Sequence, residues 1–320
     1  PPEAGETWIR PVGGEPAQPV WGHVNGIRIA LAPMPGPRGL IRIYTPYLRH
    51  EKEKAMNFFA FEPIVKGEDK RGLSELEKSQ LDGVQGKRFW SSNDSLASEP
   101  REEVFPARGI IKRAGGTETL TVFIFSEEFE NGAKVYTKIK FYAHKPYEIE
   151  ISTYALEDSK ELEQFIVTAT MGNYARLRDL FLKNGKISSL ELWPEYVGDH
   201  FTEHKVFSKE EFLQSNKKGA FFIAAPDEQK PQNVSYAKGT AKNWKYFGKK
   251  ATQYWYTENL PPSLKGAVNG RFKYWGSKAP IPKGISFENF ELQQPFKQGA
   301  KYVFGVSPLD PGDFISKNIK

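Results

Sequence analysis

The most regular pattern of apolar and polar residues along the chain lies at 133–143. Two interleaved sets alternate through it: Val135, Thr137, Ile139 and Phe141 form one, and Tyr136, Lys138, Lys140 and Tyr142 form the other. A period of two predicts a β-strand, because successive side chains of a strand point to opposite faces of the sheet. Since the second set contains lysines, we expect a long strand with one face in water.

Two further runs flank this strand. The segment 120–125 is β-branched and aromatic, and 147–154 alternates again after Pro146. Asn131-Gly132 lies between the first two runs, and both residue types tolerate the positive φ angles of a hairpin turn. The three runs together predict an antiparallel meander.

Similar short runs recur between prolines and glycines along the whole chain. We expect further strands at 27–32, 40–44, 57–61, 165–170, 188–192, 220–224, 253–256, 286–292 and 302–306. Helical patterns are few: 72–81, 174–182, and a capping-box spacing at Ser208 and Glu211. No internal repeat or linker is evident. The pattern therefore predicts one all-β domain over 1–320, a large antiparallel β-sandwich (jelly roll or supersandwich) with a few short peripheral helices.

The composition is that of a folded chain and excludes several kinds of chemistry. Hydrophobic residues make up 39% of the 320 residues, and no apolar run approaches the roughly 18 residues of a membrane-spanning helix. The absence of cysteine excludes disulfides, thiol nucleophiles and cysteine metal sites. The chain has no Gly-x-Gly-x-x-Gly, phosphate-loop or Gly-x-Ser-x-Gly motif, which argues against nucleotide-driven and α/β-hydrolase chemistry.

Basic and aromatic residues are concentrated in the segment 240–280. The whole chain has a formal net charge of only +6, yet this segment contains eight basic residues and one acid, Glu258. From it we select the candidate substrate-binding residues Trp244, Trp255, Arg271, Lys273 and Trp275. Cations beside flat rings suit an acidic polysaccharide, or single-stranded nucleic acid, whose bases stack and phosphates pair. The alternative is a hairpin with its rings inward and its lysines outward.

Tyr174, Arg176 and Arg178 form a second candidate cluster. On a strand all three share one face, whereas on a helix the two arginines do not. Such a row could neutralise a uronate carboxylate and supply a phenol as acid or base. The alternative is the start of a helix whose arginines are ordinary surface or ion-pairing groups.

One histidine and two acids complete the candidate catalytic residues. His144 ends the strand at 133–143 and is a candidate general base, with a surface or turn-capping histidine as the alternative. Glu62 and Glu288 lie among aromatic residues, which can raise the pKa of a carboxyl group as a general acid requires. Alternation explains Glu62 equally well, with Phe inward and Glu outward. The strand around Glu288 is polar on both faces, so it could line a cleft.

No cofactor is predicted. His200 and His204 are spaced by four residues, but the glutamate between them is misplaced for the HExxH pattern. Calcium is left open, because oxygen ligands in sandwich loops need no fixed spacing.

Four motifs carry a resemblance to known proteins. The segments 37–44 (PRGLIRIY), 171–178 (MGNYARLR), 277–282 (SKAPIP) and 287–291 (FENFE) resemble a group of exported bacterial β-sandwich proteins associated with carbohydrate breakdown. The resemblance covers most of the chain and implies export and a role with carbohydrate, and it brings no catalytic residues. The meander is also loosely similar to galactose-mutarotase-like sandwiches, a likeness of fold alone. The mutarotase pattern of paired histidines and a glutamate is not evident.

We therefore expect an exported protein that acts on or binds a polysaccharide of acidic character. In a lyase, Tyr174 or His144 would remove the proton α to a uronate carboxylate, which Arg176 and Arg178 would neutralise. In a hydrolase, Glu62 and Glu288 would be the acid and its partner, and their separation would distinguish retention from inversion. The basic surroundings favour the lyase. The non-enzymatic alternative is a glycan-binding protein; nucleic acid is not expected as a partner, because no familiar motif for it appears.

Overall fold

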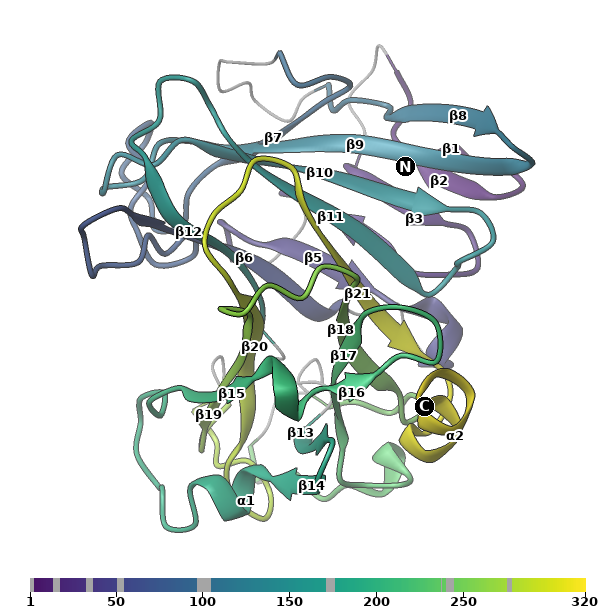
Figure 1. The fold of residues 1–320 in the computed structure, drawn as a ribbon, viewed down its shortest axis with the longest axis vertical. Coiled ribbons are helices and arrows are strands. Elements are labelled where there is room, and N and C mark those ends of the chain that lie inside the picture. The colour runs from purple at the N-terminus through teal and green to yellow at the C-terminus, as the bar shows by residue number, and fades with distance from the viewer. Residues whose placement is uncertain are drawn as a thin grey trace. The chain divides into compact units, whose positions relative to one another are not determined.

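The fold consists of two large antiparallel sheets with a few short helices (Figure 1). A computed structural model describes residues 3–13, 18–32, 37–50, 55–96, 105–170, 176–236, 238–239, 245–274 and 278–320. The predicted all-β antiparallel sandwich is confirmed.

The chain divides into two compact units, each built from three separate segments. Unit 1 comprises Pro1–Tyr44, Phe59–Val167 and Pro295–Val303. Unit 2 comprises Thr45–Phe58, Thr168–Gln294 and Phe304–Lys320. Three strands contribute residues to both units: β6 (Ala55–Val65), β12 (Leu162–Thr170) and β21 (Ala300–Ser307).

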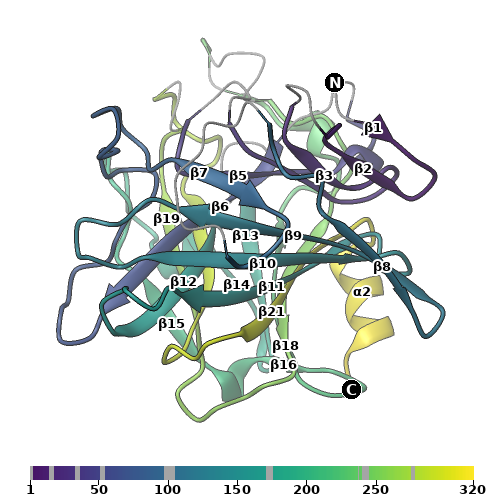
Figure 2. The ribbon, with the colours of Figure 1, turned by 90° about the horizontal axis from the view of Figure 1, so that it is seen from above.

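Unit 1 contains one layer from each sheet. Its first layer follows the order β1 (Glu3–Ala4), β2 (Trp8–Arg10), β3 (Val20–His23), β4 (Arg28–Ala30), β5 (Ile41–Tyr44), β6 and β12. Its second layer follows β11 (Glu148–Ala155), β10 (Val135–Tyr142) and β9 (Thr117–Ser126), beside which lie β7 (Phe89–Ser92) and β8 (Ile110–Ala114). Figure 2 shows β8, β9, β10 and β11 as neighbouring strands.

Apolar side chains from both layers form the core of unit 1. Phe61 of β6 stacks on Phe89 of β7 at 4.7 Å between ring centroids and meets Phe165 of β12 edge-on at 5.3 Å. Burial alternates without interruption along β10, and the buried set begins at Val135. The β9–β10–β11 meander and its one solvated face are thus as predicted from the period of two.

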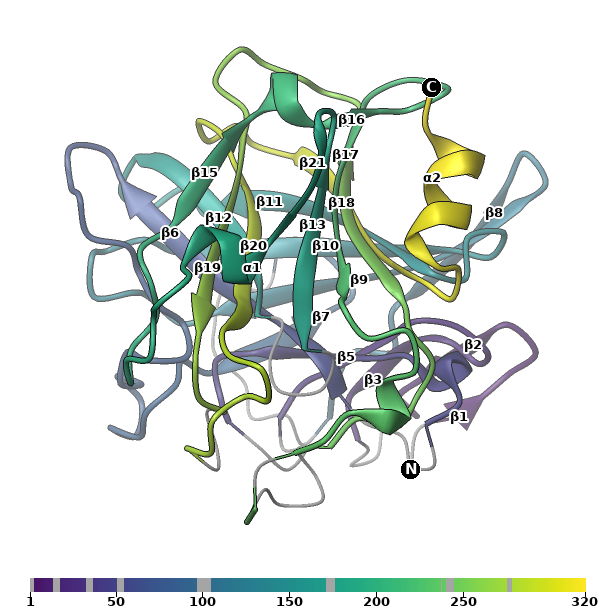
Figure 3. The same ribbon diagram turned by 90° about the horizontal axis from the view of Figure 1, so that it is seen from below.

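Unit 2 has the same two-layer construction. One layer follows β12, β20 (Ser286–Gln293), β19 (Lys265–Arg271) and β15 (Lys205–Ser208). The other follows β14 (Gly185–Ser188), β13 (Leu177–Leu182), β17 (Ala220–Pro226), β18 (Thr252–Thr257) and β21, with β16 (Leu213–Gln214) paired to β17 (Figure 3). Among the described residues, the remaining elements are two helices, α1 (Ser189–Leu192) and α2 (Pro311–Asn318), and the 3₁₀ turns η1 (Pro46–Leu48), η2 (Lys209–Glu211) and η3 (Pro231–Asn233).

Large aromatic residues join the two layers of unit 2. Phe222 of β17 stacks on Phe290 of β20 at 4.9 Å. Phe314 of α2 packs on Phe221 and Tyr254, so this helix covers an apolar patch of the β17–β18 side.

Three of the sequence-based element predictions are wrong. The segment 72–81 is not a helix, because its backbone bonds to β6 instead: the Gly72 amide donates to Pro63 and the Ser74 amide to Phe61. Residues 177–182 of the second expected helix form β13, whose first four residues are all buried and so show no informative period.

The expected strand at 188–192 is also wrong, since 189–192 is α1. Ser188 and Glu191 form a capping box at its start, and such a box stabilises a helical turn. The capping box predicted at Ser208 and Glu211 is confirmed, where it begins η2.

Candidate functional site

Four aromatic rings form a row across the outer face of the unit 1 meander. Trp90 lies opposite Phe125, Phe125 opposite Tyr136, and Tyr136 opposite Tyr154. Their rings stack at 5.9, 4.7 and 4.9 Å between centroids. Trp90 and Phe125 are buried, whereas Tyr136 and Tyr154 are half-buried. The row therefore presents its tyrosine end to solvent.

A set of lysines lies beside this row. Lys138 is opposite Phe123, and its Nζ is 5.9 Å from the centroid of that ring. Two residues further along β10, the Nζ of Lys140 is 5.6 Å from the ring centroid of Tyr142. Two neighbouring lysines of β10 thus each lie over a ring, at distances typical of cation–π contacts.

The charges on this face repel one another. Burial lowers the pKa of Lys138, and the nearby ammonium groups of Lys140, Lys301 and Lys112 lower it further, while Glu150 acts in the opposite sense. Like charges crowd together at a cost unless an opposite charge joins them. We name this surface the aromatic–lysine face, formed by Phe123, Tyr136, Tyr142, Tyr154, Lys112, Lys138, Lys140 and Lys301.

Tyr142, Glu150 and His144 lie at the end of the aromatic–lysine face. The Tyr142 hydroxyl donates to Glu150 Oε2 at 3.0 Å, and burial together with this carboxylate raises the pKa of Tyr142 to about 12. The predicted base His144 is exposed in the turn after β10, with its ring 5.9 Å from that of Tyr142. Of the predicted catalytic residues in the described part of the chain, His144 is the one beside this face.

Arg176 and Arg178 bind one carboxylate in unit 2. Nε and Nη2 of Arg176 donate to Asp227 Oδ1 at 2.9 and 2.7 Å, and Nη1 of Arg178 donates to Oδ2 at 3.1 Å. Arg178 lies in β13, whereas Arg176 precedes this strand with a positive φ of 37°. Both guanidinium groups are buried, so they are positioned to hold Asp227 rather than to meet a polymer. Tyr174 lies outside the described residues.

Arg178 also fixes the loop between β19 and β20. Its Nε donates to the carbonyl oxygen of Ile285 at 2.9 Å, and its Nη2 donates to those of Pro282 and Gly284 at 2.5 and 2.6 Å. Four acceptors surround one guanidinium, which explains how it is buried completely. Asp227 completes this buried network, and sequence reasoning missed it.

The predicted acids Glu62 and Glu288 are each paired with an arginine. Glu62 of β6 accepts from Arg71 Nη1 at 2.5 Å in unit 1. Glu288 of β20 lies 2.7 Å from Arg271 Nε in unit 2. Both acids are buried, but they belong to different units. Each carboxylate therefore already has a cationic partner in its own unit.

A β-bulge explains why the pattern around Glu288 is not amphipathic. The register between β19 and β20 shifts between Val268 and Gly270, so β20 has one residue more than its partner. The Asn289 amide donates to Asn269 Oδ1 at 3.0 Å across this bulge. β20 also lies between β12 and β19 in the interior of its layer. Its polar residues are therefore buried, and the expected cleft lining is a buried strand.

Four of the rings that the structure describes in 240–280 are buried, as in the alternative interpretation of this segment, whereas Phe247, Tyr256 and Phe272 are half-buried. Trp255 is 1% exposed, and its Nε1 donates to the carbonyl oxygen of Phe290 at 2.8 Å. Tyr246, Tyr254 and Tyr274 are equally buried. Trp255 is thus a core residue and cannot bind a substrate at the surface. Trp244 and Trp275 lie outside the described residues.

Two of the predicted binding residues in this segment lie beside acids. Arg271 is buried beside Glu288, and Lys273 forms an ion pair with Asp199. Within the segment, Lys245 Nζ lies 5.8 Å from the ring centroid of the nearby Tyr236. A further combination of cations and rings occurs on the aromatic–lysine face. Its signal was present in the sequence as the alternation of Tyr136, Lys138, Lys140 and Tyr142.

Other kinds of site find no support in the described ranges. No group of three or more His, Asp or Glu side chains among these residues could hold a metal ion. No helix in this part of the chain is long and apolar enough to span a membrane. No family model, curated protein or solved structure matches the chain.

Proposed function

We propose that the protein binds an acidic polysaccharide along the aromatic–lysine face of unit 1. The observation that carries this proposal is the half-buried row of stacked rings beside lysines that repel one another. Sugar rings stack on flat aromatic faces, and uronate or sulfate groups neutralise the crowded ammonium groups.

One feature favours a polysaccharide over single-stranded nucleic acid. The face combines its lysines with a carboxylate, Glu150, that already accepts from the Tyr142 hydroxyl. Such paired donors and acceptors suit sugar hydroxyls.

Binding has more support than cleavage among the described residues. The predicted neutralising arginines already bind Asp227, and the two predicted acids each lie beside an arginine. His144 remains accessible beside the face, so a catalytic contribution from it is part of the test. The protein is proposed to act first as a glycan-binding protein, with export as its corresponding location.

The experiment is affinity electrophoresis in gels that contain polygalacturonate, alginate, heparin or neutral dextran. We expect retardation by one or more anionic polymers, weakened at least tenfold by Tyr136→Ala or Lys138→Ala. The matched control is Lys66→Ala, because Lys66 is exposed in the same unit and pairs with Glu161. Thermal unfolding of each variant shows that it is folded.

Three results would count against the proposal. Equal binding by both variants would dismiss the aromatic–lysine face, and equal retardation by dextran would dismiss acidic recognition. Tighter binding to single-stranded DNA at the same salt concentration would assign nucleic acid instead. Ultraviolet absorbance from unsaturated uronates, lost in His144→Gln, would assign a lyase.

A further inference from the structure

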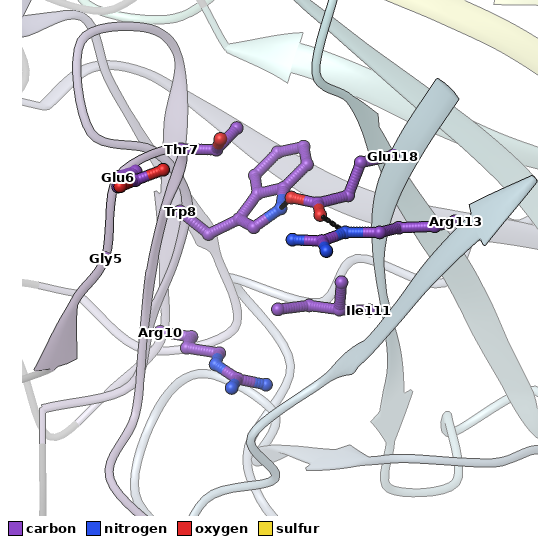
Figure 4. A pocket seen from close by; sticks show the side chains of 8 residues that line it. All are labelled: Gly5, Glu6, Thr7, Trp8, Arg10, Ile111, Arg113 and Glu118. Carbon is purple, nitrogen blue, oxygen red and sulfur yellow. Dashed lines mark hydrogen bonds and ion pairs between the residues drawn. The ribbon is translucent and has the colours of Figure 1, made fainter. Parts of the chain in front are cut away.

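A pocket of about 250 Å³ lies in unit 1, on the side of β8 and β9 that faces β1 and β2. Its lining comes from the start of the chain and from the β8–β9 hairpin (Figure 4): Gly5, Glu6, Thr7, Trp8, Arg10, Ile111, Arg113 and Glu118. The aromatic–lysine face lies on the opposite side of the same hairpin, because Lys112 and Ile111 alternate along β8. The pocket is therefore separate from the proposed polymer-binding surface.

Glu118 organises the polar side of the pocket. It accepts from Trp8 Nε1 at 2.5 Å and from Arg113 Nε. The hydrogen bond from Arg113 holds the pKa of Glu118 below its usual value, so the carboxylate is charged at neutral pH. A carboxylate has about four acceptor positions, and these two donors leave capacity for a ligand hydroxyl.

The apolar wall of the pocket is rigid. Trp8 is buried, its ring lies 4.7 Å from that of His23, and its indole N–H is fixed by Glu118. Figure 4 shows the Arg113 guanidinium between the Trp8 indole and the Ile111 side chain. The apolar surfaces of Trp8 and Ile111 therefore lie beside two planar polar groups. The Arg113 guanidinium can donate hydrogen bonds, and the Glu118 carboxylate can accept them.

The charges of the lining balance. Two acids, Glu6 and Glu118, accompany two arginines, Arg10 and Arg113. Glu6 and Glu118 both stabilise the charged form of Arg113. Since no sign of charge is in excess, the pocket does not select an anion or a cation. It offers donors and acceptors in pairs, which is what adjacent hydroxyl groups require.

The pocket has room for one small ring. Its volume of about 250 Å³ corresponds to about eight water molecules at roughly 30 Å³ each. We propose that this pocket binds one neutral monosaccharide unit, with its hydroxyls on Glu118 and Arg113 and its apolar face against Trp8 and Ile111. This site is independent of the polymer-binding face.

The test is titration of the full chain with glucose, galactose, mannose, N-acetylglucosamine and glucuronate, followed by the indole N–H resonance of Trp8. That resonance is assigned by its disappearance in Trp8→Phe. We expect one or more of the neutral sugars to shift it saturably at millimolar concentration, since a single small ring makes few contacts. Ile111→Trp should fill the pocket and weaken binding at least tenfold, and Glu118→Gln should weaken it similarly.

Lys66→Ala is the control, because it changes an exposed residue of the same unit that lies in neither site and should leave sugar binding unchanged. If the Trp8 resonance does not shift up to the solubility limit of any of these sugars, the proposal is overturned. A shift produced by glucuronate alone, or equal binding by Ile111→Trp, would also overturn it. We also measure retardation of Ile111→Trp in gels that contain the anionic polymers. If sugar binding is lost but this retardation persists, the substitution has disabled the pocket and not the aromatic–lysine face.

Discussion

Asp227 lies between Arg176 and Arg178 and accepts hydrogen bonds from both, at 2.7 to 3.1 Å. Burial acts to raise the pKa of Asp227, but the charges and hydrogen bonds of Arg178 and Arg176 prevail and hold it below the usual value. Asp227, whose side chain is 24% exposed, thus joins two buried arginines that lie 49 and 51 residues before it in the chain. Its function is to hold the ends of β13 and β17 and the loop before β20 together.

Asp227→Ala should lower the free energy of unfolding by about 3–5 kcal/mol, because two buried guanidinium groups lose their counter-ion. The measurement is urea unfolding at neutral pH. Since the pKa of Asp227 is lowered in the folded state, the stability it provides should be lost as the pH falls through that lowered pKa. Asp199→Ala is the control, because it removes a surface partner of Lys273; an equal loss there would contradict this assignment.

His23 should make folding sensitive to mild acid. Burial lowers its pKa to about 4, and its hydrogen bond with the carbonyl oxygen of Tyr142 opposes this only in part. The unfolded chain therefore binds a proton that the folded chain does not between about pH 6.5 and 4, so stability falls as the pH falls through this window. This difference in pKa corresponds to a loss of about 3 kcal/mol in the free energy of unfolding across the window.

The measurement is the free energy of unfolding as a function of pH for the original chain and for His23→Gln. The variant should lose most of the dependence between pH 6.5 and 4. His144→Gln, which removes an exposed imidazole from the same unit, controls for the loss of a histidine. An unchanged slope in His23→Gln would show that another group titrates.

Trp255 should contribute to the stability of the fold, whereas Tyr154 should contribute mainly to polymer binding. Trp255→Ala removes a buried indole from the core of unit 2 and should cost about 3–5 kcal/mol of stability. Tyr154→Ala removes a half-buried ring from the aromatic–lysine face and should cost about 1 kcal/mol while weakening polymer retardation. Denaturant unfolding and affinity electrophoresis on both variants separate the two roles; the reverse ranking would refute them.

Gly39 is required by both its backbone angle and its surroundings. Its φ is 71°, and a methyl group there would lie 1.8 Å from the carbonyl oxygen of Ser74. Gly67 has a similar φ of 80° with no atom within 4 Å. Gly67→Ala should cost about 1 kcal/mol, and Gly39→Ala about 1–3 kcal/mol more. Equal values in thermal unfolding would mean that the loop around Ser74 moves freely.

As the pH rises, polymer binding should begin to weaken at a lower pH than the usual pKa of a lysine predicts. Burial and the neighbouring lysines lower the pKa of Lys138, so this cation loses its proton before the usual value of about 10.4 is reached. Lys138→Arg retains its charge throughout and should delay the decline. Retardation between about pH 8 and 11 measures the effect, and identical profiles for both chains would exclude Lys138 from the site.

The strands that could be predicted from the sequence are those with one wet face. β10 shows its period directly, because its buried and solvated residues alternate. β13 and β20 are buried on both faces in most of their length, so their sequences contain no alternation that distinguishes inside from outside. The bulge at Glu288 depends on its partner Asn269, which no local pattern reveals.

The candidate site could be predicted only in part, for the same reason. Tyr136 and Lys138 were visible on the solvated face of one strand. Trp90, Phe125 and Tyr154 join them only through the register of three other strands, which sequence spacing does not fix. Asp227 was missed because its arginine partners lie 49 and 51 residues away.

The interleaving of the two units has a consequence for any attempt to dissect the molecule. Unit 1 begins at Pro1 and ends at Val303, and unit 2 begins at Thr45 and ends at Lys320. A contiguous fragment that contains one unit therefore contains nearly all of the other. Neither unit can be truncated, transplanted or inherited as a separate module, so the ring row of unit 1 and the arginine network of unit 2 must be produced, and selected, together.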